Sequence, residues 1–275
     1  MKAFTLILIT ISFFFSLACT GGPRKPIAKN GKNVKFEWDF SREKKFVYTF
    51  HQTVNNEMVH TKGGAVDKMH MTGDGFLTVK VKANKLADVI LSDILLKSIN
   101  YDQDGKPTKE DEMELPTNVA QDMKPDGSFG ERNVDLLFGI LLPLPLKTLN
   151  TGESDKIALQ IPFNANGSVL FSKGFNTLTF KGYESLLGRT CAVFKGIIDI
   201  SDFKVPEELY GEYENYSTGE ATYYFDTDAR CYVGADIHWV MNAIMDSKSN
   251  DETHSGMYMD SKSDNVFEIR LDRIE

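Results

Sequence analysis

The segment CYVGADIHWVM, residues Cys231–Met241, alternates apolar and polar side chains over a length that decides the fold. Strict alternation is the mark of a β-strand with one face in a core and the other in water. The apolar side chains that would share one face are Val233, Ala235, Ile237, Trp239 and Met241, with Asp236, His238 and Asn242 on the other. Strands usually have about five or six residues. Longer strands occur in strongly curved sheets and in barrels.

The same alternation recurs in shorter runs, separated by turn signals such as Asp226–Arg230 and Asp104-Gly105. The runs are Phe36/Trp38/Phe40, Phe46/Tyr48/Phe50, Leu77/Val79/Val81 and Phe267/Ile269/Leu271. Asn133 could cap a helix over Val134–Leu142, and Leu86–Leu96 fits either a helix or a strand. We therefore predict a mainly β protein, a large curved antiparallel sheet or open β-barrel with one or two helices. Residues 36–275 are expected to form a single β-rich domain.

The N-terminus has the pattern of an export signal. Met1-Lys2 is a cationic start, and the uncharged stretch Ala3–Ala18 is short for a membrane-spanning helix. Ser16-Leu17-Ala18-Cys19 resembles the lipobox of bacterial lipoproteins, in which the cysteine is acylated and becomes the new N-terminus. We expect a signal peptide over residues 1–18 and a lipidated Cys19. The alternative is ordinary cleavage after Ala18, which would give a secreted, soluble protein.

Residues 19–35 are expected to form a basic tether between the anchor and the body. They contain five Lys or Arg and no acid, whereas the body from Phe36 onward has 25 basic against 39 acidic residues. The tether could lie near anionic lipid headgroups while the acidic body is repelled from them, or it could be a solvated linker; both readings stay open. The acidic body argues against a nucleic-acid partner, because binding there depends on neutralising phosphates.

Cys191 and Cys231 remain as a pair if Cys19 is acylated. An even number of cysteines in an oxidising compartment is typical of a disulfide, so this pair is the candidate bridge. It would close a loop of about 40 residues and stabilise the fold by roughly 3–4 kcal/mol in the chain-entropy account. The alternative is two buried free thiols on separate strands.

One acidic segment fits the template of a calcium-binding loop. Asn100, Asp102, Asp104 and Asp111, with Gly105 at the turn, occupy ligand positions of the EF-hand pattern. Pro107 and the Asp in place of a long Glu at the last position count against calcium. The alternative interpretation is an acidic hairpin turn.

No other motif predicts chemistry. The sequence has no Gly-x-Ser-x-Gly, His-Glu-x-x-His, phosphate-binding Gly loop or Cys-x-x-Cys. His51 and His238 fall on the polar faces of predicted strands and would meet at a metal only if those strands were neighbours. We therefore predict a protein that is not an enzyme and carries no cofactor.

Several glycine- and proline-centred patterns run through residues 36–275, namely Pro143-Leu144-Pro145, Thr151–Ser154, Gly188–Cys191 and Gly219–Asp226. With the lipobox at Cys19, they make the chain similar to a family of uncharacterised β-rich bacterial lipoproteins. The resemblance implies a place in the bacterial cell envelope, at the outer membrane or cell surface, with membrane lipid as a partner through the N-terminal anchor. It implies no activity and no catalytic residue.

Two functions are compatible with these features. The first is a non-catalytic binding or structural role. The second is a carrier of lipid or another apolar ligand, because 10 Met and 19 Phe could line a cavity inside the curved sheet. An apolar cavity above about 300 Å³ would favour the carrier, and a sheet filled by side chains would favour the first role. The ligand and any protein partner stay open.

Overall fold

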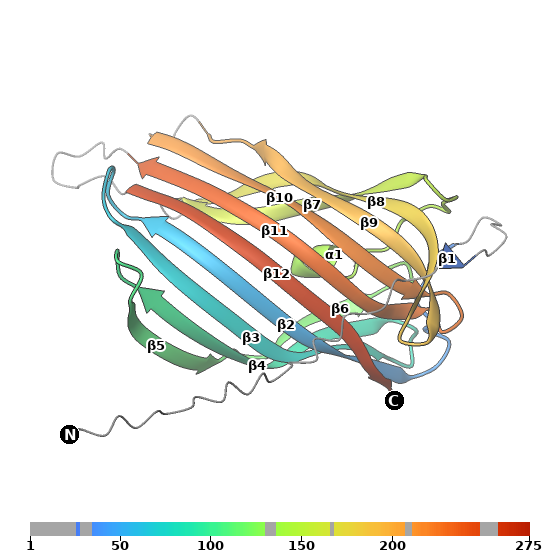
Figure 1. The fold of residues 1–275 in the computed structure, drawn as a ribbon. Helices are drawn as coiled ribbons and strands as arrows, with labels where there is room; N and C mark the ends of the chain where they lie inside the picture. The colour runs from blue at the N-terminus through green and yellow to red at the C-terminus, as the bar shows by residue number, and fades with distance from the viewer. Residues whose placement is uncertain (1–25, 28–34, 130–135, 166–167, 207–210, 248–257) are drawn as a thin grey trace, which may run out of the picture.

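The computed structural model describes residues 26–27, 35–129, 136–165, 168–206, 211–247 and 258–275 (Figure 1). Within these ranges the chain forms twelve strands and one short helix. The elements are β1 Pro26–Ile27, β2 Lys44–Val59, β3 Val66–Val81, β4 Ala87–Tyr101, β5 Pro107–Glu114, β6 Asn118–Met123, α1 Leu136–Leu141, β7 Ser154–Ala165, β8 Ser168–Leu186, β9 Arg189–Phe203, β10 Gly211–Asp226, β11 Cys231–Ser247 and β12 Tyr258–Ile274.

All twelve strands belong to one antiparallel sheet, ordered β1-β8-β9-β10-β11-β12-β2-β3-β4-β5. β7 pairs with β8 beside β1, and β6 pairs with β4 beside β5, so these strands form the two open edges. The sheet curls around α1 (Figure 1). The prediction of a mainly β fold with a large, curved antiparallel sheet is confirmed. Pro26–Ile27, within the predicted tether, pairs with Tyr183 and Glu184 of β8 at the sheet edge.

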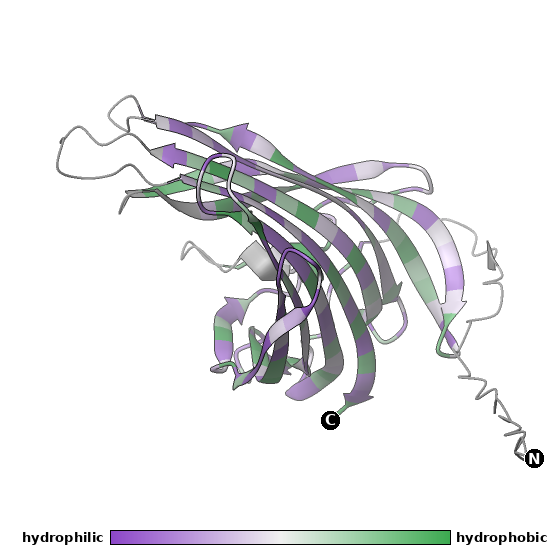
Figure 2. Cartoon of the chain, turned by 60° about the vertical axis from the view of Figure 1, so that its left-hand side comes forward, coloured by the Kyte–Doolittle hydropathy of each residue, from purple (hydrophilic) through white to green (hydrophobic). Residues whose placement is uncertain are grey.

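One face of the sheet carries the main core, and we call it the inner face. Apolar and polar side chains alternate along the strands, which appears as alternating bands in Figure 2. The predicted apolar sets of β2, β3 and β12 lie in this core, including Tyr48, Leu77 and Ile269, which are fully buried. The inner face is therefore built as the sequence pattern requires, with the opposite, outer face turned to solvent.

Part of the inner face is covered by two segments that are not strands, and we call this part the closed half. Residues 36–40 supply Phe36, Trp38 and Phe40, and residues 140–149 supply leucines and Ile140. Trp38 is 1% exposed and its ring lies 5.4 Å from that of Phe46. Side chains from both segments merge with those of the sheet into one core cluster.

The prediction of a strand over Phe36–Phe40 is wrong, although its apolar positions were identified correctly. Its backbone is held by isolated bonds instead of a ladder: the Trp38 N–H donates to the Pro125 carbonyl at 2.7 Å, and the Asp39 N–H to that of Arg230 at 2.9 Å. Alternation records which side chains are buried, and an extended segment lying across a core produces the same pattern as a strand.

The long segment Cys231–Met241 is a strand, but its side chains do not keep one phase. The pairing of β10 with β11 shifts between Tyr224 and Phe225, so Val233 is the extra residue of a β-bulge. Val233 joins Cys191 and Tyr224 in a separate small cluster, whereas Ala235 and Ile237 lie in the main core. Val233 is thus wrongly placed by strict alternation.

The segment after α1 is fixed to the sheet by buried tyrosine hydroxyls. The Tyr223 hydroxyl donates to the Ile140 carbonyl at 2.6 Å, and the Tyr232 hydroxyl donates to that of Pro143. The last carbonyls of a helix have no partner within the helix, and the Tyr223 hydroxyl satisfies that of Ile140 in the last turn of α1. The Tyr232 hydroxyl satisfies a carbonyl just beyond the end of the helix. The helix expected over Val134–Leu142 is present as α1, with Asn133 outside the described residues. The segment Leu86–Leu96, which fits either a helix or a strand by its sequence, lies in strand β4 from Ala87 onward.

Candidate functional site

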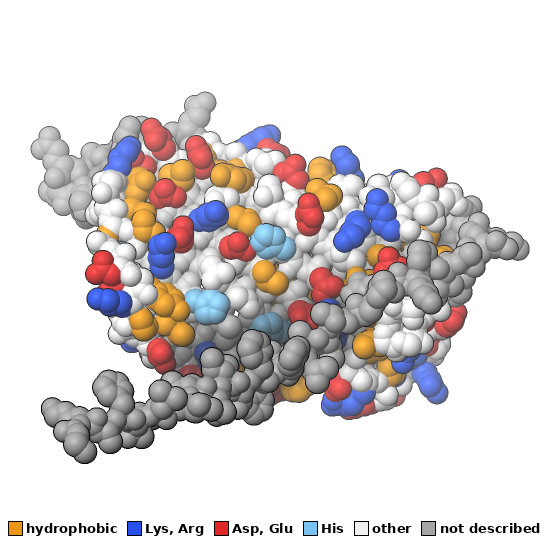
Figure 3. All heavy atoms as spheres, viewed as in Figure 1, with side chains coloured by type: hydrophobic (Ala, Val, Ile, Leu, Met, Phe, Trp, Pro, Cys, Tyr) orange, Lys and Arg blue, Asp and Glu red, His pale blue; other side chains and the backbone are white. Residues whose placement is uncertain are grey.

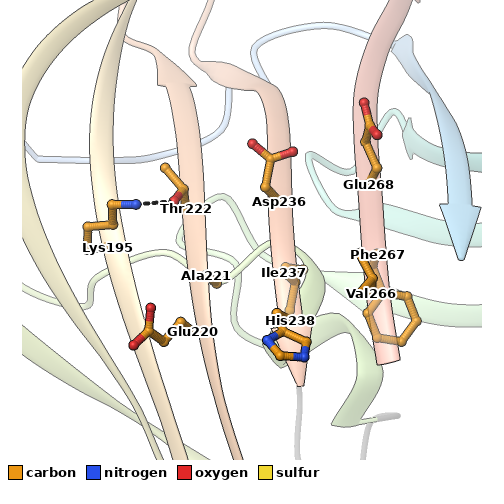
Figure 4. A pocket seen from close by; sticks show the side chains of 10 residues that line it. All are labelled: Lys195, Glu220, Ala221, Thr222, Asp236, Ile237, His238, Val266, Phe267 and Glu268. Carbon is orange, nitrogen blue, oxygen red and sulfur yellow. Dashed lines mark hydrogen bonds between the residues drawn. The ribbon is translucent and has the colours of Figure 1, made fainter. Parts of the chain in front are cut away.

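The outer face is a charged surface with histidines among both kinds of charge (Figure 3). It holds a shallow depression of about 210 Å³ over β9 to β12 (Figure 4). Thr222 and Val266 are short side chains there, with longer ones around them, including Lys195, Glu220 and Glu268. The hollow is therefore a consequence of differences in side-chain length on the outer face of the sheet.

Several polar side chains of this depression are engaged by neighbours within it or beside it. Lys195 Nζ donates to the Thr222 hydroxyl at 2.6 Å, and Arg270 pairs with both Asp236 and Glu268. Ligand pockets are usually larger, about 300–1,000 Å³, and mostly apolar. The depression is smaller than that and polar around its rim, so we do not take it as the functional site.

The two histidines considered in the sequence do not meet. His51 lies on β2 and His238 on β11, with β12 between them. Each has its own carboxylate instead: His51 Nδ1 is 2.7 Å from Asp74 Oδ1, and His238 Nε2 is 2.8 Å from Asp264 Oδ1. Among the described residues, no group of three or more His, Cys, Asp or Glu is placed to hold a metal ion.

Asn100, Asp102, Asp104 and Asp111 lie in the hairpin between β4 and β5 and do not form a calcium loop. Asp102 Oδ1 accepts hydrogen bonds from the backbone N–H groups of Asp104 and Lys106, at 3.0 and 2.8 Å. Asp111 sits on β5 and pairs with Lys109 Nζ at 2.6 Å. Asp102 is used to close its own turn, and Asp111 is neutralised by a lysine. The predicted residues therefore do not form one set of calcium ligands.

Cys191 and Cys231 are both free and buried, so the candidate disulfide is absent. They lie on β9 and β11, and both are paired in register with Asp226 of the intervening β10. Two strand spacings are about 9.6 Å, beyond the Cα separation of a disulfide. Burial raises the pKa of each thiol to about 12, which makes both poor nucleophiles.

Cys19 and the predicted signal peptide lie outside the described residues. Within the described part of the chain, no helix has the length and apolar character needed to cross a membrane.

The inner face beyond the closed half is the surface with the most unusual composition, and we call it the open half. Strand register places six of the ten methionines on it, together with Trp239. They are Met58 of β2, Met69 and Met71 of β3, Met241 and Met245 of β11, and Met259 of β12. Trp239, Met241 and Met71 are only partly buried. Methionine is flexible and polarisable and adapts to irregular apolar shapes.

Serine and asparagine fill the positions between these methionines. Across the sheet, Ser217 pairs with Met241, which pairs with Ser263; Ser263 pairs in turn with Asn56, and Asn56 with Met69. On β10, β11, β12 and β2 the described inner-face positions of the open half include no charged residue. Along β3 the first charge is the exposed Asp67, opposite Met58. The surface is therefore uncharged, although it is not uniformly apolar.

Five buried polar atoms in the described part of the chain have no hydrogen-bond partner, and three of them lie on this half: Asn215 Oδ1, Ser217 Oγ and Trp239 Nε1. The other two are Trp38 Nε1 and Asn176 Oδ1. Asn215 is 4% and Ser217 1% exposed. Trp239 pairs across the sheet with Gly219, where an added Cβ would lie 2.4 Å from the His238 carbonyl oxygen. Buried polar groups are normally bonded, so three orphans on neighbouring strands require an explanation. Sequence reasoning noted the methionine content but missed this corner.

No family model matches this chain, and no curated protein matches it in sequence. Among solved structures, a similar one is a structure of lipovitellin concerned with lipid–protein interactions. The two chains share 9% identity with a TM-score of 0.35, and the match covers 86% of this chain and 26% of the lipovitellin chain. A likeness of this size carries no argument about function.

Proposed function

We propose that this chain is a cell-envelope lipoprotein of a bacterial membrane, held there by an acylated Cys19 and acting as a non-catalytic binding module. The open half of the inner face is its binding surface. The observation that carries the binding role is this surface with six methionines and no charged residue on β10, β11, β12 and β2. None of the six is a buried member of the closed-half core cluster, although Met71 packs against it; Met245 and Met259 belong to a second, smaller cluster with Leu170 and Tyr213. The lipobox pattern at Ser16–Cys19 supports the anchor.

Replacing Cys19 with serine is expected to move the protein from the membrane fraction to the soluble fraction. Two or three acyl chains hold a protein on a bilayer, at about 0.8 kcal/mol for each buried CH₂, and serine cannot carry them. Fractionation of cells followed by mass spectrometry of the mature N-terminus measures the effect. Thr20→Ser is the matched control and should stay membrane-bound. Unchanged partitioning of Cys19→Ser would place the attachment elsewhere.

A lysine on the open half is expected to abolish binding of an uncharged apolar dye such as Nile red. In the soluble Cys19→Ser chain, Met241→Lys should weaken dye binding by about tenfold or more, because a charge buried under the dye has no partner. Val240→Lys is the matched control: it adds the same charge next to Met241, on the outer face opposite Asp264. Thermal unfolding verifies that both variants fold. Equal dye binding by the two variants, or no binding by the parent chain, contradicts the proposal.

A further inference from the structure

The inference begins with the corner where the three unpartnered atoms lie. Asn215 and Ser217 are two residues apart on β10 and point to the same face. Ser217 pairs with Met241 and Gly219 with Trp239, so Trp239 is the diagonal neighbour of Ser217 on β11. Diagonal neighbours are about 7–8 Å apart at Cα, within reach of a tryptophan ring. The three orphans therefore belong to one place on the open half.

From this corner we propose that the ligand of the open half is an uncharged amphiphile, an apolar chain that ends in a hydroxyl-bearing group such as that of a monoacylglycerol. Its head lies at Asn215, Ser217 and Trp239, and its chain lies over the methionines. This assignment rests on the proposed binding function and adds the chemical class of the ligand.

The unpartnered atoms determine the hydrogen-bonding character of the head. Asn215 Oδ1 is an acceptor, the indole N–H of Trp239 is a donor, and the Ser217 hydroxyl can act as either. A hydroxyl group on the ligand can donate a hydrogen bond to Asn215 Oδ1 and accept one from the indole N–H of Trp239. A hydrocarbon end, or a group with acceptors alone, would leave at least one buried atom without a partner.

The absence of charge determines that the head is neutral. Trp239, Ser217 and Asn215 are surrounded on β10, β11 and β12 by inner-face Met, Ser, Asn, Ala, Tyr and Gly residues. A carboxylate or phosphate there would lose its hydration and gain no cation in return. The Lys and Arg side chains of these strands belong to the outer face, as Arg270 does in its pairing with Asp236.

The methionines determine the character and reach of the chain. Beyond the head, from β11 to β3, the open half crosses three strand spacings, about 14 Å. That matches the reach of an acyl chain in one leaflet, roughly 15 Å of a hydrocarbon core near 30 Å thick. Met241, Met58, Met69 and Met71 lie along this path. The methionine side chains can rearrange around a flexible acyl chain. The same rearrangement lets the head group of the ligand reach atoms that are buried when no ligand is bound.

The test uses the two tryptophans of the chain as reporters. A monoacylglycerol with a dibrominated acyl chain is added to the soluble Cys19→Ser protein, since bromine quenches a tryptophan in contact with it. Trp239 should be quenched, while Trp38, 1% exposed in the closed half, should not. Trp239→Phe should abolish the quenching and Trp38→Phe should retain it. The matching dibrominated fatty acid at about pH 9, where its carboxylate is charged, should bind about tenfold or more weakly.

Ser217→Ala tests the head-group contacts. It should weaken monoacylglycerol binding about three- to tenfold, since one hydrogen bond is lost, while the stability of the free protein stays equal or rises because an orphan is removed. Thr218→Ala, exposed on the outer face of the same strand, is the control and should change neither.

The outcomes separate the two proposals. Quenching of Trp239 by the neutral amphiphile, weakened in Ser217→Ala, supports the assignment. Equal binding of the fatty acid anion, or equal binding by Ser217→Ala and Thr218→Ala, overturns the ligand class and leaves the binding function standing. If neither the brominated amphiphiles nor Nile red bind, the binding function itself is overturned.

Discussion

A Trp38→Ala variant is expected to lose about 3–5 kcal/mol of unfolding free energy, the usual cost of removing a large aromatic side chain from a core. Trp38 is 1% exposed, and its ring centroid lies 5.4 Å from that of Phe46 and 5.5 Å from that of Tyr232. It also anchors residues 36–40, which have no ladder to hold them, so the cavity cannot close without moving the whole segment. Urea unfolding followed by circular dichroism measures the loss.

Trp239→Ala is the matched comparison, because it removes the same side chain from a strand of the sheet, β11, outside the closed half. Trp239 is only partly buried, whereas Trp38 is 1% exposed, so the loss of Trp239 should cost less than half as much unfolding free energy. Equal losses in the two variants would show that the closed half is not the main source of stability.

The protein is expected to lose stability steeply above about pH 10. Burial raises the pKa of Tyr48, Tyr223 and Tyr232 above its ordinary value, while in the unfolded chain tyrosine ionises near pH 10. Below about pH 10 both states keep these protons and stability is unaffected. Above it the unfolded state releases protons that the folded state retains, so the unfolding free energy falls as pH rises. Three tyrosines together give a slope of about 4 kcal/mol per pH unit.

Urea unfolding at about pH 8, 10 and 11 measures this slope, with tyrosinate absorbance recorded in parallel. Cys191 and Cys231, whose pKa values burial raises to about 12, act in the same direction. Tyrosinate absorbance from the buried hydroxyls should appear together with the loss of strand signal. Titration of all ten tyrosines in a protein that stays folded would contradict the burial of these hydroxyls.

The fold class was predictable because alternation is a local signal. Phe46, Tyr48 and Phe50 needed only their own neighbours to be recognised as one face of a strand. The failures arise where the backbone departs from its ladder. Phe36–Phe40 is buried without a partner strand, and the bulge at Val233 moves one residue to the other face. Neither of these two departures can be recognised from the order of apolar and polar residues.

The open half could not be predicted in detail, because it is assembled from distant parts of the chain. Met58 and Met259 come from opposite ends of the sequence and meet only because β2 pairs with β12. The same holds for Cys191 and Cys231, whose separation by β10 decides against a bridge. Composition indicated an adaptable apolar surface. Which residues lie beside Asn215, Ser217 and Trp239 on the neighbouring strands depends on strand register, which a single sequence does not reveal.

The pairing of β12 with β2 also has a consequence for folding. The centre of the sheet joins β2 to β12, so it cannot be completed until residues 258–274 have been synthesised. Contacts between such distant segments form slowly, because a long loop must be ordered first. For a chain with an expected export signal, this pairing leaves the sheet incomplete until β12 has been made.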